Sequence, residues 1–302
     1  MSIAYLISAH TDPLQLKRLI DALHPDAQFF VHVDKKSDMS AFASILQREN
    51  VHFVENRIDV IWGTIRQVED QMTLIKAVLD YPTEFDRIFF LSGLDYPLWS
   101  NEHITTWLEE HPDQEFIAGY CMDTDELPAD QRLLYQVPRP FFHLNGLNRR
   151  WNERLRVLCR KMKKWTGVRK PLSFMVDGER WQLYKGADWW CVSQGLLAHI
   201  YNVYTQKPEV RDYFADSFAP SETLPQTIAF NSPQWASRCI LHKGEYPGLT
   251  RLTPLHCIVY DPVIKVMDEN DYDMLLASGK MFARKFVSGK SDQLIQLLHG
   301  RN

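Results

Sequence analysis

Two adjacent basic residues near the C-terminus, Arg284 and Lys285, stand inside the otherwise apolar run 282–286. Moving charges without partners into an apolar setting is costly, so these residues should meet an anion from elsewhere in the fold or from a ligand. A diphosphate would suit them, because Arg presents a planar fork and Lys a point charge to phosphate oxygens. A helix or strand end whose basic side chains reach solvent explains the pair equally well at this stage.

A second candidate for chemistry is Glu222, which follows the turn signal Pro220-Ser221. The pattern predicts that a helix begins near Glu222, where the helix dipole favours an ionised carboxylate. Such a carboxylate can remove the proton of an attacking hydroxyl, and general-base catalysis of this kind contributes about 10²–10⁴-fold in rate. A carboxylate that only stabilises the start of a helix is the alternative, and the local sequence by itself favours that alternative.

Strand and helix patterns alternate over the first hundred residues. Apolar runs predict strands at 3–8, 29–33, 52–55 and 87–91, and helical spacing predicts helices at 13–23, 39–48 and 68–79. This alternation predicts an α/β fold with a mostly parallel sheet flanked by helices and a ligand site at the carboxyl ends of the strands. Polar residues follow several of these strands, notably His10, Asp34 and the stretch 92–96, as a nucleotide site would require.

Composition narrows the function classes. The chain has 302 residues, with no internal repeat or clear linker, which favours one continuous domain over residues 1–302. The net charge of −4 creates no overall field that would favour nucleic acid. The five cysteines are scattered without C-x-x-C spacing, which argues against a zinc site or a disulfide framework and for a reducing compartment.

The sequence also lacks several common signals. The segment 1–7 has no basic leader and is typical of a buried strand, and no stretch approaches the ~18 apolar residues of a membrane span. We therefore expect a cytoplasmic location, with possible peripheral attachment to the inner face of the membrane. There is no Gly-x-Gly-x-x-Gly pattern and no Walker-type loop, so dinucleotide and P-loop sites lose their main support.

Seven segments, taken in chain order, carry a resemblance to a known family. They are Ala4–His10 with Asp12-Pro13, Val31–Lys36, Val60–Gly63, Phe90–Leu98, Lys185–Ser193, Pro220–Glu222 with Gln226-Thr227 and Asn231-Ser232, and Phe282–Phe286. Their order resembles the core-2/I-branching β-1,6-N-acetylglucosaminyltransferases, a family that includes the peptide O-xylosyltransferases, and the chain is similar to a bacterial-type member. Each segment alone is a weak signal, and seven in order are a strong one.

The resemblance implies a glycosyltransferase-A fold, a UDP-sugar donor, inversion at the anomeric carbon and no need for a divalent cation or other cofactor. It implies that Glu222 is the base for the acceptor hydroxyl, while Lys285 and Arg284 neutralise the leaving UDP. Physical reasoning agrees, because fixed cations stabilise charge where it develops and one carboxylate suffices for a single inversion. Residues 1–120 would bind the nucleotide sugar, and residues 121–302 would bind the acceptor and carry the catalytic groups.

The remaining site residues also follow from the resemblance. The expected donor-binding residues are His10, Asp34, Trp62 and, on a loose match, Arg251; the expected acceptor-binding residues are Asp95, Tyr96, Lys185, Trp189 and Trp190. The expected donor sugar is N-acetylglucosamine, with xylose as the runner-up. The expected acceptor is a glycan or a lipid-linked oligosaccharide.

A metal-dependent nucleotide-sugar enzyme is the alternative within the enzymes. Asp123 and Asp125 form an Asp-x-Asp pattern after a predicted strand at 115–120, and such a pair supplies the oxygen ligands that hold a cation against a diphosphate. Two-residue patterns arise often by chance, and the strand end at which the pair is expected carries only Asp95. We therefore favour a site without a metal.

Residues 149–170 contain ten Lys or Arg and one Glu, with Leu155, Leu158, Met162 and Trp165 spaced for one helix face. A solvated helix is the default interpretation of such a run. A basic amphipathic helix could also lie on an anionic membrane or contact an acidic acceptor. A non-enzymatic carbohydrate- or nucleic-acid-binding protein remains a further alternative, although it would not need Glu222 or the basic pair.

Overall fold

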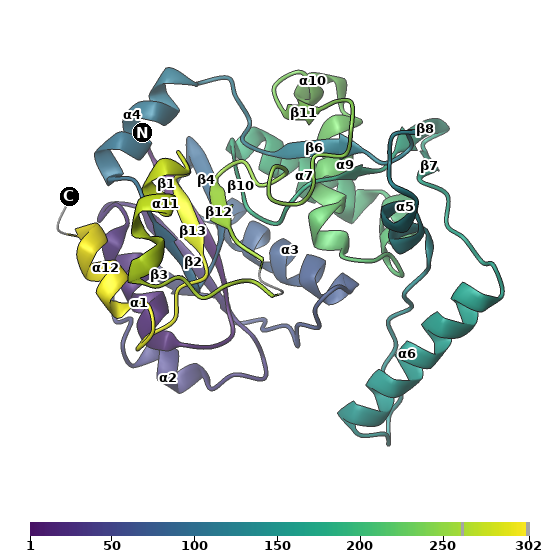
Figure 1. Cartoon of the computed structure of the whole chain (residues 1–302), viewed down its shortest axis with the longest axis horizontal. Coiled ribbons are helices and arrows are strands. Elements are labelled where there is room, and N and C mark those ends of the chain that lie inside the picture. Colours follow the sequence, from purple (N-terminus) through teal and green to yellow (C-terminus); the bar gives the residue numbers. More distant parts are fainter. Residues whose placement is uncertain (261–262, 300–302) are drawn as a thin grey trace.

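The computed structural model describes residues 1–260 and 263–299. Its central sheet has the strand order β10-β4-β1-β2-β3 (Figure 1). The strands are β1 (Ile3–Ala9), β2 (Gln28–Val33), β3 (Val51–Phe53), β4 (Arg87–Ser92) and β10 (Trp190–Val192). The first four are parallel and β10 is antiparallel to β4, so the predicted mostly parallel sheet is confirmed.

Both faces of this sheet are covered by helices, as predicted. Alternate residues of β1 point to opposite faces, so Leu6 packs in one core cluster and Tyr5 and Ile7 in another. The Leu6 face is covered by α3 (Ile65–Leu79), α7 (Gln194–Gln206), α8 (Pro208–Phe214) and α9 (Leu224–Phe230). The opposite face is covered by α1 (Pro13–Ala22), α2 (Met39–Ala43) and α4 (Asn101–Glu110).

Local sequence explains where these helices begin. The Asp12 side chain accepts a hydrogen bond from the Gln15 backbone ahead of Pro13, and Thr64 caps α3 in the same way. The helix predicted over 39–48 was too long, because α2 ends at Ala43. The strand predicted at 115–120 is β6 (Ala118–Cys121).

Two smaller sheets and a hairpin complete the strands. Their members are β5 (Asp95–Pro97), β9 (Tyr184–Lys185), β11 (Ile240–His242), β12 (His256–Ile258), β13 (Phe282–Arg284), and the hairpin β7 (Ser173–Val176) with β8 (Glu179–Gln182). The orders are β11-β6-β9 and β12-β13-β5. Pairing of β13 with β5 sets Arg284 opposite Asp95, which brings the C-terminal basic pair to the carboxyl end of β4.

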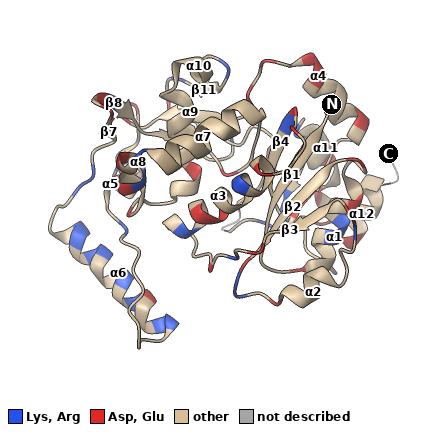
Figure 2. Cartoon of the chain, turned by 180° about the vertical axis from the view of Figure 1, so that it is seen from behind, with Lys and Arg blue, Asp and Glu red and all other residues tan. Residues whose placement is uncertain are grey.

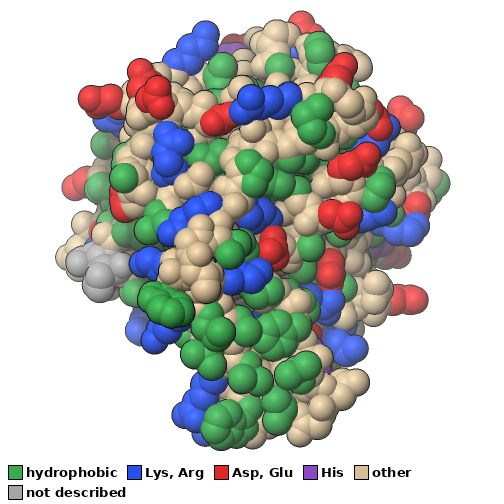
Figure 3. Space-filling model, turned by 90° about the vertical axis from the view of Figure 1, so that its right-hand side faces the viewer, with side chains coloured by type: hydrophobic (Ala, Val, Ile, Leu, Met, Phe, Trp, Pro, Cys, Tyr) green, Lys and Arg blue, Asp and Glu red, His purple; other side chains and the backbone are tan. Residues whose placement is uncertain are grey.

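The remaining helices lie mostly at the periphery. They are α5 (Ala129–Gln136), α6 (Arg149–Trp165), α10 (Pro233–Ala236), α11 (Tyr272–Ala277), α12 (Asp292–His299), and two 3₁₀ turns, Pro220–Glu222 and Glu269–Asp271. Helix α6 projects from the body and carries basic residues along its length (Figure 2). Figure 3 shows hydrophobic side chains gathered over the projecting part. Within the described residues, no helix is both long and apolar enough to cross a bilayer.

Candidate active site

A cavity of about 220 Å³ opens at the carboxyl ends of β1 and β4. Its walls come from residues after β1 and β2, from α3, and from the later segments that carry Asp188, Trp189, Ser221 and Arg284. Ligands of α/β folds bind at this edge of the sheet, so the cavity lies where the strand pattern predicted a site. Residues from 8–92 and from 188–284 therefore meet around one space.

Arg284 is held at this cavity by a buried carboxylate. One of its terminal nitrogens donates to Asp95 Oδ1 at 3.0 Å, and its guanidinium lies 5.2 Å from the centre of the Trp189 ring. His256 Nε2 lies 3.1 Å from the other Asp95 oxygen. Burial opposes ionisation of Asp95, yet His256 and Arg284 lower the pKa of this fully buried carboxyl. Asp95 is therefore the anionic partner that the apolar run required.

Arg284 keeps the capacity to bind a further anion. Its Nε is buried and has no hydrogen-bond partner among the described residues. Lys285 follows directly and forms no ion pair within the described part of the chain, although it is not among the residues that line the cavity. Partial burial and the charge of Arg284, with smaller contributions from Lys36 and Lys285, lower the pKa of His10. His10 is therefore a neutral imidazole at the cavity wall at physiological pH.

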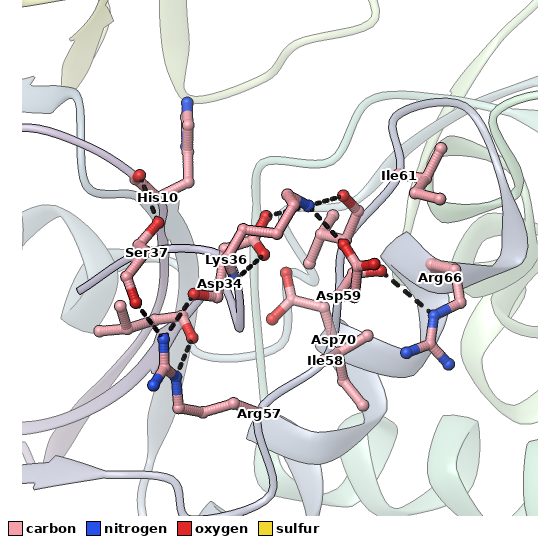
Figure 4. A network of polar contacts seen from close by, with 12 residues as sticks. His10, Asp34, Lys36, Ser37, Arg57, Ile58, Asp59, Ile61, Arg66 and Asp70 are labelled. Carbon is pink, nitrogen blue, oxygen red and sulfur yellow. Dashed lines mark hydrogen bonds and ion pairs between the residues drawn. The ribbon is translucent and has the colours of Figure 1, made fainter. Parts of the chain in front are cut away.

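Asp34 lies in a network of polar contacts after β2 (Figure 4). Its carboxylate lies 2.8 Å from Lys36 Nζ, which also contacts Asp59 at 2.8 Å. Arg57 donates to the backbone carbonyls of Val33 at 2.8 Å and Asp34 at 2.7 Å. The His10 ring points away from this network in Figure 4. Asp34 thus lines the cavity and also holds the loop that carries it.

Glu222 forms an ion pair with Lys185, whose Nζ lies 2.5 Å from Glu222 Oε2. Burial opposes the charge of Lys185, but Glu222, together with Tyr135 and Tyr246, raises the pKa of Lys185 well above its usual range. The sequence predicted that a helix begins near Glu222. In the structure Glu222 ends a 3₁₀ turn, and α9 starts two residues later. Lys185, expected on the acceptor side, contacts the candidate base itself.

Asp188 lines the cavity and is influenced by the charges of Glu222 and Lys185. The sequence predicted no role for it. Burial, followed by the negative charge of Glu222, raises the pKa of Asp188 to about 7. Gln71 of α3 donates to Asp188 Oδ1 at 3.3 Å. Nothing in the local sequence separates Asp188 from a surface carboxylate, since its environment is built by α3 and by the 221–222 turn.

The structure does not bring every predicted residue to this cavity. Tyr96 is buried, and its hydroxyl lies 2.6 Å from His299 Nε2. Trp190 is fully buried and stacks on Phe90 with ring centres 5.4 Å apart. Arg251 is exposed in a turn and does not line the cavity. These three positions belong to the core or to the surface. Glu222, Lys185 and Asp95 also lie outside the residues that line the cavity.

Trp62, Trp189 and the Asp-x-Asp pair are placed differently. Trp62 and Trp189 both line the cavity, and 68% of Trp62 is exposed. Asp123 forms an ion pair with Arg180 at 3.0 Å, and neither it nor Asp125 lines the cavity. Within the described ranges, no group of three or more His, Cys, Asp or Glu side chains is arranged to hold a metal ion.

Comparison with known proteins decides the family. The model of the family described as "Core-2/I-Branching enzyme" matches residues 3–248. The chain belongs to this glycosyltransferase family. Membership confirms the resemblance found in the sequence and, together with the mostly parallel sheet, the predicted fold class.

Curated proteins similar to this family member include xylosyltransferases. Xylosyltransferase 2 of Mus musculus is 28% identical over 245 residues, covering 78% of this chain and 25% of the relative. Xylosyltransferase 2 of Homo sapiens is 27% identical over 240 residues, covering 76% and 24%. The chain thus spans about a quarter of the length of the curated relatives that it matches.

Solved structures are similar at a much lower level. Mouse xyloside xylosyltransferase 1 has a TM-score of 0.34 and 11% identity, covering 80% of this chain and 84% of that one. Glucosyl-3-phosphoglycerate synthase from Mycobacterium tuberculosis, solved with Mn²⁺ and UDP, has a TM-score of 0.35 and 11% identity, covering 81% and 73%. TM-scores of this size do not distinguish one activity from another.

Proposed function

We propose that the chain is an inverting glycosyltransferase that moves a sugar from UDP to a hydroxyl of a glycan acceptor. The observation that carries the proposal is Arg284, fixed by buried Asp95 at a cavity on the carboxyl edge of a parallel sheet. A fixed cation at this place suits the diphosphate of a leaving nucleotide. His10, Asp34 and Trp62 are proposed to contact the nucleoside.

In the proposed reaction, an acceptor hydroxyl attacks the anomeric carbon while Glu222 takes the hydroxyl proton. The bond from this carbon to the diphosphate oxygen breaks, and UDP leaves with the electron pair. Arg284 and Lys285 stabilise the negative charge that develops on the diphosphate, a task that needs no divalent cation in this proposal. The ion pair with Lys185 holds the Glu222 carboxylate in place before the acceptor arrives.

The donor sugar is proposed from the relatives. The xylosyltransferases among its curated relatives favour UDP-xylose over UDP-N-acetylglucosamine, the sugar expected from the sequence. A screen of donor consumption against both nucleotide sugars, run with and without EDTA, tests the sugar and the metal independence together. Activity that EDTA removes and Mn²⁺ restores would overturn the metal-free proposal in favour of the alternative with Asp123 and Asp125.

The role of Glu222 is tested with Glu222→Gln. Transfer should fall at least about 10²-fold while UDP still binds. Because this change leaves the buried Lys185 without its carboxylate and can unfold the chain, the double variant Glu222→Gln/Lys185→Met is made beside it. Glu179→Gln, an exposed carboxylate of β8, is the matched control and should keep full activity. Near-normal transfer by a folded Glu222→Gln variant would refute the assignment.

We also propose that α6 lies on an anionic bilayer. Four of its apolar side chains are more than half exposed, Trp151 at 52%, Leu158 at 51%, Met162 at 55% and Trp165 at 88%. Helical spacing sets them on one face, and the surrounding Lys and Arg complement anionic headgroups. A lipid-linked acceptor would be presented at such a surface.

Flotation with vesicles that contain or lack phosphatidylglycerol tests this contact. Binding is expected with the anionic lipid at low salt, and Leu158→Ser with Met162→Ser should reduce it. Val263→Ser, which removes another exposed apolar side chain, is the control. Absence of binding to anionic vesicles at low salt would overturn the membrane contact.

A further inference from the structure

A second cavity, of about 210 Å³, lies between α6 and the loop at 61–64. Its walls include three arginines, Arg139, Arg156 and Arg160, and one acidic residue, Glu153. None of the three arginines forms an ion pair with a carboxylate in the ranges 1–260 and 263–299. Three positive charges against one negative charge leave the cavity with an excess of about two.

Arg139 is held there by contacts that leave part of its binding capacity unused. Its guanidinium lies 3.4 Å from the centre of the Phe218 ring. Its Nε is buried and has no hydrogen-bond partner among the described residues. Burial, and then the charge of Arg160, lower the pKa of Arg139 to about 9. The buried Nε without a partner and the burial of the charge beside Arg160 both destabilise the charged guanidinium. A bound anion would accept a hydrogen bond from Nε and offset the positive charge.

The second cavity adjoins the first. Trp62 lines both, so the two spaces share this side chain as a wall. Phe218, under Arg139, precedes the segment that carries Glu222, and Ala219 N donates to Gly63 O at 3.2 Å. The Arg156 and Arg160 face of α6 is opposite in helical phase to the exposed apolar face of Trp151, Leu158 and Trp165. The arginines thus turn inward and the apolar face turns outward.

We propose that this second cavity binds a phosphate or diphosphate group carried by the acceptor. The planar guanidinium of arginine donates pairs of hydrogen bonds to phosphate oxygens. The three arginines therefore favour a phosphate group over a sugar that carries no negative charge. The inference deepens the proposed function and rests on it, because an acceptor anchored beside Trp62 would extend its sugar hydroxyl toward Glu222. The ligand chemistry is that of a glycosyl phosphate or diphosphate, whether free or attached to a lipid.

Calorimetric titration with inorganic pyrophosphate tests the site in the full chain. Saturating UDP is added first, so that the first cavity is already filled. Wild type should bind pyrophosphate, and Arg160→Gln and Arg139→Gln should each weaken binding about tenfold or more, since charge-assisted hydrogen bonds are lost. The control Lys161→Gln/Lys164→Gln removes two exposed charges from α6 and should bind as wild type does.

Either of two results would refute the proposed site. One is that UDP-saturated wild type does not bind pyrophosphate, and the other is that the Lys161→Gln/Lys164→Gln control loses as much pyrophosphate affinity as the arginine variants. Because Arg139→Gln removes the stack on Phe218 and can unfold the chain, Arg139→Lys is measured beside it and should retain intermediate affinity. Unchanged UDP affinity certifies the fold of each variant.

Two further competition experiments distinguish a phosphate carried by a glycosyl acceptor from a phosphate in a lipid headgroup. In the first, a soluble glycosyl diphosphate competes with pyrophosphate; in the second, phosphatidic acid vesicles do so. Competition by the sugar compound supports an acceptor subsite, whereas competition by the vesicles alone reduces the cavity to a headgroup contact and refutes the acceptor role. If UDP itself does not bind, the proposed function fails, and pyrophosphate binding without UDP then reports on this site separately.

Discussion

Asp188→Asn should change the pH dependence of stability. In the fold, the pKa of Asp188 is raised from its ordinary 3.8 to about 7, by burial first and then by the charge of Glu222. The difference is about three pH units, and each unit is worth about 1.4 kcal/mol. Because Asp188 lines a cavity that admits water, we expect the cost of its ionisation in the fold to be on the order of 2–4 kcal/mol.

The sign follows from proton binding. Below about pH 4, Asp188 is protonated in the folded and unfolded chains, so its ionisation carries no penalty there. As the pH rises toward 7, the unfolded chain ionises first, and wild type loses this part of its stability. Asn cannot ionise, so Asp188→Asn should equal wild type near pH 4 and exceed it by about 2–4 kcal/mol at pH 8.

Urea unfolding of both proteins from pH 4 to pH 8 measures this difference directly. Titrations common to both chains cancel when the two free energies of unfolding are subtracted. Asp125→Asn, at an exposed position outside the cavity, is the control and should show a small difference at all pH values. In a Glu222→Gln background the effect should shrink, because the second cause of the shift is gone. A difference between wild type and Asp188→Asn that is equal at pH 4 and pH 8 would refute the reasoning.

Three further variants probe the frame of the site. Asp95→Asn should lower stability by about 3–5 kcal/mol and weaken UDP binding, because Arg284 loses the buried carboxylate that positions it; urea unfolding and UDP titration measure both. Gly186→Ala should lower stability by about 1–3 kcal/mol in the same unfolding assay, since its Cβ would lie 2.1 Å from the Ala118 carbonyl oxygen. Trp62→Ala should leave stability within about 0.5 kcal/mol, given its 68% exposure, while weakening donor binding; a large loss of stability would contradict this.

The central sheet could be predicted because its signals are local. Apolar runs of strand length alternate with helical spacing, and the carboxyl ends of parallel strands share one edge. His10 and Asp34 were predicted as site residues on that basis, and both line the cavity. Their function as donor ligands stays a prediction.

Neighbouring residues in β5 show where local signals end. Asp95 and Tyr96 point to opposite faces of the strand, because successive side chains alternate. Asp95 meets His256 and Arg284, while Tyr96 meets His299, and all of these partners lie more than 150 residues away. Only the register of β5 with β13 decides which of the two neighbours meets Arg284, and no local pattern encodes that register.

The same limit explains why the electrostatics around Glu222 could not be predicted. Lys185 lies 37 residues before Glu222, and the backbone bond from Gly186 N to Glu222 O at 2.8 Å joins the two segments. Asp188 lies beside this pair, and its pKa is raised by burial and by the charge of Glu222 and lowered by Lys185. The proposed base therefore stands in a group of two carboxylates and one ammonium, and the fold, not the local sequence, assembles that group.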